Sequence, residues 1–400
     1  MTDRGLVDRL AELAVVVGAN VQAGQVVTVG ANIGQGKLAR AIAEQAYRRG
    51  ARFVDVSYFD PYVKRARIEL AAQDTLDGVP SWYRARVRAL AETRSARISL
   101  AGPTEPEALR GLDPDRLGRD QLPWLNEWME VIQSRTVNWT VVPCPTEDWA
   151  RLCFPELPEP AAVERLRREI AHVCRLDEPD PATAWRARAA ELGQVGARVS
   201  ELRLDALHLQ GPGTDLTIGL LPSSSWLSAK ATTVDGLEHL PNVPTEEVFT
   251  SPDPERVDGH VRSTRPLVLA DGTLVRGLEV RFERGRAVAI EADEGAAVLR
   301  GRAVQDEGAG RLGEVALVDR SSRVGRLETV FYETLLDENA ASHLALGDGF
   351  REAVDEDDAA RVNRSGIHVD FMVGCAELDV TGITRDGRRL PLLRDGAWQI

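Results

Sequence analysis

Side chains able to bind a metal ion gather in four short segments of the C-terminal half. These segments contain several carboxylates and two of the six histidines, and they are PTEEVF (244–249), LGEVAL (312–317), DENAASH (337–343) and HVDF (368–371). Oxygen and imidazole donors with carboxylates in excess and no cysteine suit a pair of divalent ions better than one structural zinc. Two ions held about 3.5–4 Å apart by shared carboxylates are typical of enzymes that hydrolyse amide or phosphate bonds.

The pair His368 and Asp370 lies in an apolar segment in which Ile367, Val369 and Phe371 alternate with polar residues. This alternation predicts a strand, on which the imidazole and the carboxylate share one face. Taken alone, the pair is more typical of an ordinary surface ion pair.

Three glutamates have apolar neighbours. Glu314 lies within LGEVALV, and a carboxylate buried there is costly unless a positive group or a metal faces it. The adjacent Glu246 and Glu247 repel each other unless a cation lies between them or one keeps its proton.

The segment DENAASH places Glu338 five residues before His343. We expect a helix that begins near Asp337 and runs past His343, with Asp337 or Asn339 as its cap. Five residues correspond to about 500° on a straight helix, so the two side chains converge only if both lie near the helix start. A lone glutamate and histidine are more often helix surface, and only the four segments together predict a metal site.

The first half of the chain alternates between strand and helix patterns. Strands are expected at 25–29, 53–57, 96–100 and 138–142, and helices at 6–17, at 37–49 and from Pro160 onward. This alternation predicts an α/β N-terminal domain with a mostly parallel sheet over residues 1–195. From about Glu201 short alternating segments and glycine turns predict a β-rich α+β catalytic domain over residues 196–400.

The turn GANIGQGKLA (30–39) is an alternative candidate site. Five residues separate Gly30 from Gly36, and Leu38 follows Lys37, so it is not a P-loop. GQGKLA fits GxGxxA, and Asp55 follows in the next strand, which leaves a nucleotide-dependent oxidoreductase as an alternative. The glycines begin several residues after the strand, which weakens that reading.

Net charge and hydropathy argue against several classes of binding partner. A net charge of −13 argues against nucleic acid and against an anionic membrane. No segment is apolar enough to span a membrane, and we expect no secretory signal. The cysteines show no paired spacing, which is typical of free thiols in the cytoplasm.

Longer motifs resemble the aminopeptidase T / aminopeptidase S family of bacterial dinuclear metalloaminopeptidases (M29). The resemblance spans almost the whole chain and is carried by LLPSSSWL (220–227), NVPTEEVFTSPD (242–253), RLGEVALV (311–318), FYETLLDENAASHLALG (331–347) and NRSGIHVDFMVG (363–374). It implies hydrolysis of N-terminal residues from short peptides by a bridging hydroxide, and a homodimer that encloses the active sites.

The resemblance also implies which residues act. The implied ligands of two divalent ions (Zn, Co or Mn) are Glu247, Glu314, Glu338, His343, His368 and Asp370, with Glu314 as the bridge. The choice of Glu247 over Glu246 follows the family spacing. Independently of the resemblance, Glu246 is the candidate general base because it lies beside a ligand.

The chain departs from the family at one position. The family has a tyrosine seven residues after the first histidine, where this chain has Phe350. A phenol that donates to the tetrahedral intermediate is then missing, unless Tyr332 or water replaces it. A catalytically impaired metal-binding homologue is therefore a further alternative.

Overall fold

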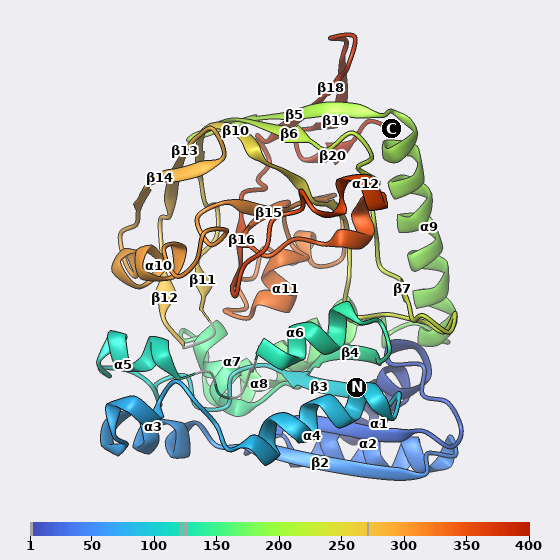
Figure 1. Cartoon of the computed structure of the whole chain (residues 1–400). Helices are drawn as coiled ribbons and strands as arrows, with labels where there is room; N and C mark the ends of the chain where they lie inside the picture. Colours follow the sequence, from blue (N-terminus) through green and yellow to red (C-terminus); the bar gives the residue numbers. More distant parts are fainter. Residues whose placement is uncertain (1–2, 121, 123–125, 270–271) are drawn as a thin grey trace. The chain divides into compact units, whose positions relative to one another are not determined.

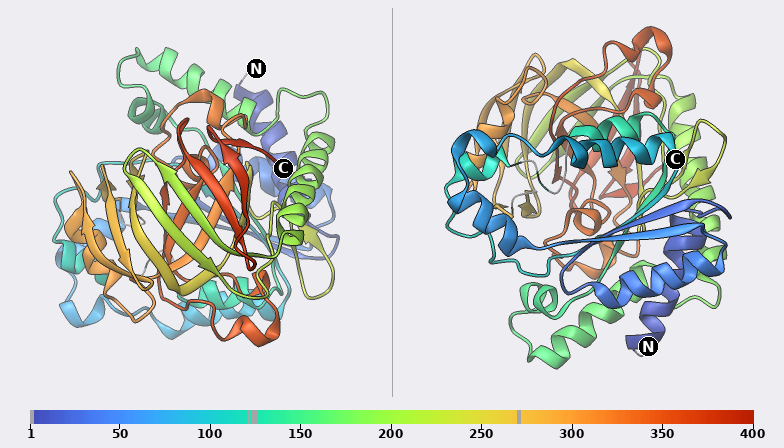
Figure 2. Two further views of the ribbon diagram at one scale, coloured as in Figure 1. Left: turned by 90° about the horizontal axis from the view of Figure 1, so that it is seen from above. Right: turned by 60° about the horizontal axis from the view of Figure 1, so that its bottom comes forward.

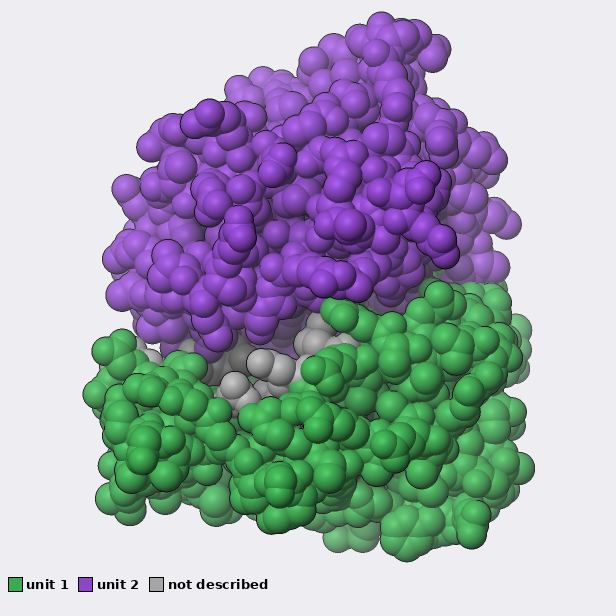
Figure 3. Space-filling view, in the orientation of Figure 1, with its two compact units in different colours: residues 1–188, 230–244 green, residues 189–229, 245–400 purple. Residues whose placement is uncertain are grey.

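The computed structural model describes residues 3–120, 122, 126–269 and 272–400 (Figure 1). The chain forms two compact units, coloured separately in Figure 3: residues 1–188 with 230–244, and residues 189–229 with 245–400. The chain passes from the first unit to the second within helix α9 (Pro181–Glu201). The domain boundary expected at residues 195–196 also lies within α9, and it stays a prediction.

The first unit contains a parallel sheet. Its strands β1 (Val26–Asn32), β2 (Phe53–Phe59), β3 (Ala96–Ala101) and β4 (Asn138–Pro143) pair in the order β2-β1-β3-β4. Val27 and Val29 of β1 are almost fully buried, as expected for β-branched residues in a strand covered on its faces. The parallel sheet predicted from the sequence is confirmed.

Helices connect and cover these strands (Figure 2, right). They are α1 (Asp3–Leu13), α2 (Gly36–Arg48), α3 (Pro61–Leu70), α4 (Ser81–Glu92), α5 (Pro114–Arg119), α6 (Asn126–Gln133), α7 (Glu147–Cys153) and α8 (Glu159–Val173), with short turns η1 (Ala14–Gly18) and η2 (Gln73–Thr75). Local signals set their starts: the Asp60 carboxylate accepts from the N–H of Tyr62 at the start of α3, and Pro160 lies in the first turn of α8. The helices predicted at 37–49 and from Pro160 are confirmed.

Residues 230–244 return to the first unit. There β7 (Ala231–Thr232) pairs with β8 (Glu238–His239), and an isolated parallel bridge joins Asn242 to Val141. This excursion divides the second unit into two stretches of chain, residues 189–229 and residues 245–400.

The second unit has a large antiparallel sheet whose strands lie side by side (Figure 2, left). In spatial order they are β14 (Arg286–Glu291), β13 (Glu279–Glu283), β10 (Pro252–Arg262), β6 (Thr214–Leu220), β5 (Leu204–Gly211), β18 (Asp379–Thr384), β19 (Arg389–Arg394) and β20 (Ala397–Trp398). Strands β11 (Leu267–Val268) and β12 (Leu274–Val275) pair separately. The antiparallel architecture predicted after Glu201 is confirmed.

A smaller antiparallel sheet of the second unit carries the candidate site. Its order is β17 (His368–Met372), β16 (His343–Gly347), β15 (Leu312–Val318) and β9 (Glu247–Thr250). Every residue of β15 and β16 is buried. Short helices α10 (Ala296–Ala303), α11 (Thr334–Glu338) and α12 (Glu356–Ala359), and turns η3 (Gly325–Leu327) and η4 (Arg351–Ala353), complete the unit.

The prediction of a helix that runs past His343 is wrong. Helix α11 ends at Glu338, and His343 begins strand β16. Ser342 already makes sheet contacts, because its carbonyl oxygen accepts from the N–H groups of Val373 and Gly374 and its Oγ accepts from that of Val318. These partners lie far away in the chain, so local pattern could not reveal them.

No helix of the described residues combines the length and the apolar character needed to cross a membrane.

Candidate metal centre

Strand register gathers five of the six predicted ligands on one face of the smaller sheet. Directly opposite residues of an antiparallel pair project to the same face, and residues two apart along a strand do so as well. The ligands concerned are Glu247 on β9, Glu314 on β15, His343 on β16, and His368 and Asp370 on β17. The residues between them on this face are small (Ala316, Ala345 and Gly347), which leaves room for the longer donors.

The donors form two groups that share Glu314. In the first, Nε2 of His343 lies 3.0 Å from Oε2 of Glu247 and 4.0 Å from Oε1 of Glu314. In the second, Nε2 of His368 lies 3.1 Å from Oε2 of Glu314 and 3.2 Å from Oδ1 of Asp370. The two carboxylate oxygens of Glu314 therefore face different groups.

Backbone carbonyls orient both imidazoles. Nδ1 of His343 donates to the carbonyl oxygen of Ala341 at 3.1 Å, and Nδ1 of His368 donates to that of Asp348 at 2.9 Å. A carbonyl can only accept, so the hydrogen lies on Nδ1 when the ring is neutral. Nε2 of each ring is then the lone-pair donor and points toward the carboxylates, the arrangement commonly seen for metal-binding histidines.

Glu338 lies at the end of α11 and is buried. It belongs to neither three-residue group of close donors, although Asn339 Nδ2 donates to its Oε1 at 3.4 Å. Burial raises the pKa of Glu338 well above its ordinary value, and the negative charges of Asp370 and Glu247 raise it further. The carboxylate of Glu338 is therefore close enough to the other candidate ligands for their charges to change its pKa.

The site holds more negative than positive side chains. Burial raises the pKa of Glu314, and the hydrogen bond from His368 only partly offsets this. Burial opposes charge on both imidazoles, yet the carboxylates raise the pKa of His343 and of His368 well above the ordinary value. Burial by itself would raise the pKa of Asp370, but the charge of His368 outweighs burial and lowers this pKa below its ordinary value. Four carboxylates facing two imidazoles favour added positive charge, which a divalent cation can supply.

Asn339 connects the predicted base to helix α11. Its Oδ1 accepts from the N–H of Glu246 at 2.6 Å, and its Nδ2 donates to the carbonyl oxygen of Leu335 at 2.9 Å. Asn339 is fully buried, and Glu246 is 1% exposed. The sequence suggested only a capping role for Asn339, and its polar neighbours Asp337 and Glu338 gave no local signal of the contact with Glu246.

Phe350 lies beside the candidate ligands. Its ring centroid is 5.7 Å from that of His368, with the rings 69° apart, and 4.9 Å from that of Phe249. Tyr332 has a different environment: the guanidinium of Arg276 lies over its ring at 5.7 Å.

The side chain of Gln35 in the glycine-rich turn after β1 makes hydrogen bonds to the protein backbone. Oε1 of the buried Gln35 accepts from the N–H of Asn32 at 2.7 Å, and its Nε2 donates to the carbonyl oxygen of Gly102 at 3.1 Å. Asp55 is paired with Arg86. The residues that suggested a nucleotide site thus have partners within the first unit.

Comparison with known proteins assigns the family. A family model described as thermophilic metalloprotease (M29) matches residues 4–398. The chain belongs to this metalloprotease family. Aminopeptidase T of Thermus thermophilus is 43% identical and aminopeptidase PepS of Streptococcus thermophilus is 37% identical, each over 98% of both chains. The solved structure of wild-type AmpT from Thermus thermophilus matches all of both chains with a TM-score of 0.90 and 42% identity.

As a member of this metalloprotease family, the protein is a metal-dependent aminopeptidase, and the resemblance stated from the sequence is confirmed. The family implies divalent metal ions. The site fits such ions, because in each group the donor atoms of two carboxylates and one imidazole lie within 4.8 Å of one another.

Proposed function

We propose that the protein removes N-terminal residues from short peptides at a site that holds two divalent ions. The observation that carries this proposal is the orientation of Glu314, whose Oε1 faces His343 and whose Oε2 faces His368. One carboxylate that serves two separate donor groups is the arrangement expected of a bridge between neighbouring ions.

In this proposal Glu247 and His343 bind on one side of Glu314, and His368 and Asp370 bind on the other. Glu338, whose pKa is raised by burial and by the charges of Asp370 and Glu247, would supply the sixth ligand. Zinc, cobalt and manganese all suit these donors. When bound, the ions would lower the pKa of a bridging water to give hydroxide at neutral pH, attract the scissile carbonyl oxygen and hold the free α-amine of the peptide.

The residues of the chain then have separate tasks. Glu246 is the candidate general base, held through its backbone by Asn339. It would take the proton from the attacking water and return it to the leaving amine. Phe350 contributes an apolar edge next to His368, where a tyrosine would donate a hydrogen bond to the developing oxyanion.

The test compares Glu314→Ala with the exposed control Glu291→Ala. We expect about two ions per chain in the unmodified protein and in the control, measured by elemental analysis. Glu314→Ala should lose metal and reduce the turnover of an aminoacyl anilide by more than about a hundredfold. Full turnover in Glu314→Ala would reject the two-ion mechanism.

A metal-binding homologue without turnover is the second candidate, because Phe350 cannot donate a hydrogen bond. Metal-loaded protein that binds two ions yet leaves anilides intact would favour it. We further propose that the protein acts as a homodimer, as the family resemblance implies, and that it is cytoplasmic, as the spacing of its cysteines indicates.

A further inference from the structure

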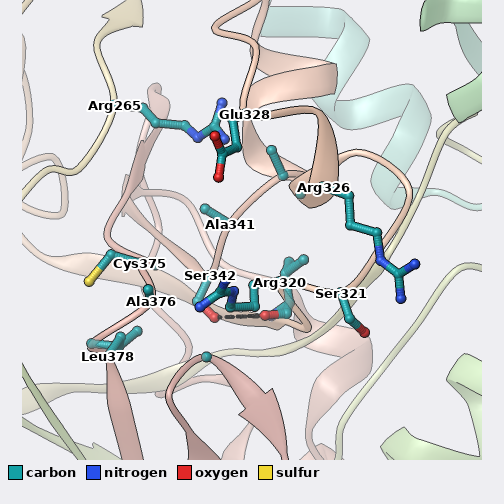
Figure 4. A pocket seen from close by; sticks show the side chains of 15 residues that line it. Arg265, Arg320, Ser321, Arg326, Glu328, Ala341, Ser342, Cys375, Ala376 and Leu378 are labelled. Atoms are coloured by element: carbon teal, nitrogen blue, oxygen red, sulfur yellow. Dashed lines mark hydrogen bonds between the residues drawn. The ribbon is translucent and has the colours of Figure 1, made fainter.

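A cavity lies next to the candidate metal centre within the same unit. Its volume is about 390 Å³, and its wall includes Val318 from the end of β15 with Ala341 and Ser342, which directly precede β16 (Figure 4). Val318 lies opposite Glu247 in the sheet. Ala341 also holds His343 through its carbonyl oxygen. The cavity is therefore lined by residues that directly neighbour two of the candidate ligands.

Three arginines distinguish this cavity in a protein of net charge −13. Arg265 has partners: it donates to the carbonyl oxygen of Thr329 at 2.7 Å and lies 3.6 Å from the carboxylate of Asp337. Glu328 also lines the cavity, and Figure 4 shows it beside Arg265. That side of the cavity is nearly balanced in charge.

Arg320 and Arg326 provide the unbalanced positive charge. Within the described residues, neither guanidinium group makes a hydrogen bond or an ion pair. Hydrogen bonds fix the backbone of both arginines. The N–H of Arg320 donates to the carbonyl oxygen of Gly396 at 3.0 Å, and the N–H of Arg326 donates to the carbonyl oxygen of Ser322 at 3.1 Å. Two guanidinium groups on fixed backbone can bind an anion through charge-assisted hydrogen bonds.

The position of the cavity indicates what kind of anion the two arginines would bind. Glu314 and Val318 lie on one face of β15, four residues apart, which corresponds to about 13 Å at about 3.3 Å per residue. An extended peptide covers that length with about four residues. A peptide whose N-terminus reaches the metal centre can therefore reach Arg320 and Arg326 with a group near its C-terminus.

We infer that the cavity at Arg320 and Arg326 is a subsite for a carboxylate of the peptide substrate. The carboxylate is either the C-terminus of a peptide of about four residues or an acidic side chain near it. The subsite rests on the proposed peptidase function and gives it a preference for short, anionic peptides.

The test uses matched tetrapeptides and metal-loaded protein. Leu-Ala-Ala-Ala with a free C-terminus is compared with its C-terminal amide, and amidated Leu-Ala-Glu-Ala with amidated Leu-Ala-Gln-Ala. We expect kcat/KM to be about tenfold higher, mainly through KM, for the carboxylate member of at least one pair. A preference in the first pair identifies the C-terminus as the ligand, and one in the second pair identifies the side chain.

The double variant Arg320→Gln/Arg326→Gln should bring the preferred ratio close to one. Arg284→Gln is the matched control, because Arg284 is an exposed arginine in the turn between β13 and β14. It should keep the ratio of the unmodified protein. Thermal unfolding verifies that each variant is folded, and the ratios of the unmodified protein test the subsite without any variant.

Two results would overturn the subsite alone: ratios near one for both pairs in the unmodified protein, or a preference that the folded double variant retains. Lack of turnover of a neutral leucyl anilide by the unmodified metal-loaded protein would instead overturn the proposed function, and the subsite with it.

Discussion

Glu314 is the residue that the two groups of candidate metal ligands share. It is buried in the middle of an apolar strand, and its two oxygens face two histidines on different strands. Burial raises the pKa of this carboxylate, so its position is unfavourable without nearby positive charge. Residues near it are held by backbone carbonyls and by Asn339 rather than by solvent-exposed side chains.

Phe350→Tyr should raise kcat by roughly tenfold or more if position 350 faces the oxyanion, because a phenol would add a hydrogen-bond donor there. KM for an aminoacyl anilide should change little. Steady-state kinetics with equal metal content are the measurement. Phe53→Tyr, at an exposed phenylalanine of the first unit, is the control. An unchanged kcat in Phe350→Tyr would separate this position from catalysis.

Glu333 gives a pH-dependent prediction. Burial raises its pKa to about 8, and the charge of Asp337 contributes; its Oε2 has no hydrogen-bond partner among the described residues. Because the folded pKa lies above the unfolded one, the neutral acid stabilises the fold at low pH. This contribution is complete below about pH 4.5 and is lost as the pH rises toward about 8.

Glu333→Gln, which mimics the neutral acid, should therefore gain stability relative to the unmodified protein between pH 5 and pH 9. Thermal unfolding at fixed metal concentration measures this difference. Glu12→Gln on the exposed side of α1 should show no such trend. Parallel pH profiles for Glu333→Gln and the unmodified protein would refute the raised pKa.

At the level of elements, the smaller sheet positions the site through close backbone contacts. The register changes between Leu312 and Glu314, so Gly313 lies at an irregular point of β15. A Cβ atom at Gly313 would lie 2.2 Å from the carbonyl oxygen of Asp348. That same oxygen accepts the hydrogen bond from His368. A glycine here lets β15 and the segment after β16 approach each other.

Gly313→Ala should therefore destabilise the fold by about 1–3 kcal/mol and weaken metal binding, because the segment that orients His368 must move. Gly301→Ala in α10 is the opposite case: no atom lies within 4 Å of its added Cβ, and helix stability should rise by about 0.5–1 kcal/mol. Urea unfolding and metal titration measure both effects. Equal stability of the two variants would contradict the close contact.

At the level of the whole molecule, the chemistry lies in the second unit. The first unit contains a parallel sheet and exposes large apolar side chains, among them Phe53, Tyr58, Tyr62 and Trp82. Such side chains are candidates for burial against another protein surface. This is compatible with the homodimer that the family resemblance implies.

Sedimentation equilibrium should therefore give twice the chain mass of 43.8 kDa at micromolar concentration. Replacing Trp82 by glutamate should shift the equilibrium toward monomer if this side chain lies in the interface. A monomer at all concentrations of the unmodified protein would reject the homodimer.

The sequence by itself determined the parts that depend on near neighbours in the chain. Alternation places His368 and Asp370 on one face of a strand, and the apolar run around Glu314 indicates a buried carboxylate. The strand and helix alternation of the first half predicts the parallel sheet, because each pattern is complete within a few residues.

Only the tertiary structure decided the rest, because strand pairing joins residues that are distant in the chain. HLALG fits a helix or a strand equally well until β15 and β17 pair with it. The same pairing turns the two oxygens of Glu314 toward different histidines. The tertiary fold also brings Arg265, Arg320 and Arg326 to one cavity, which no local pattern in the sequence predicts.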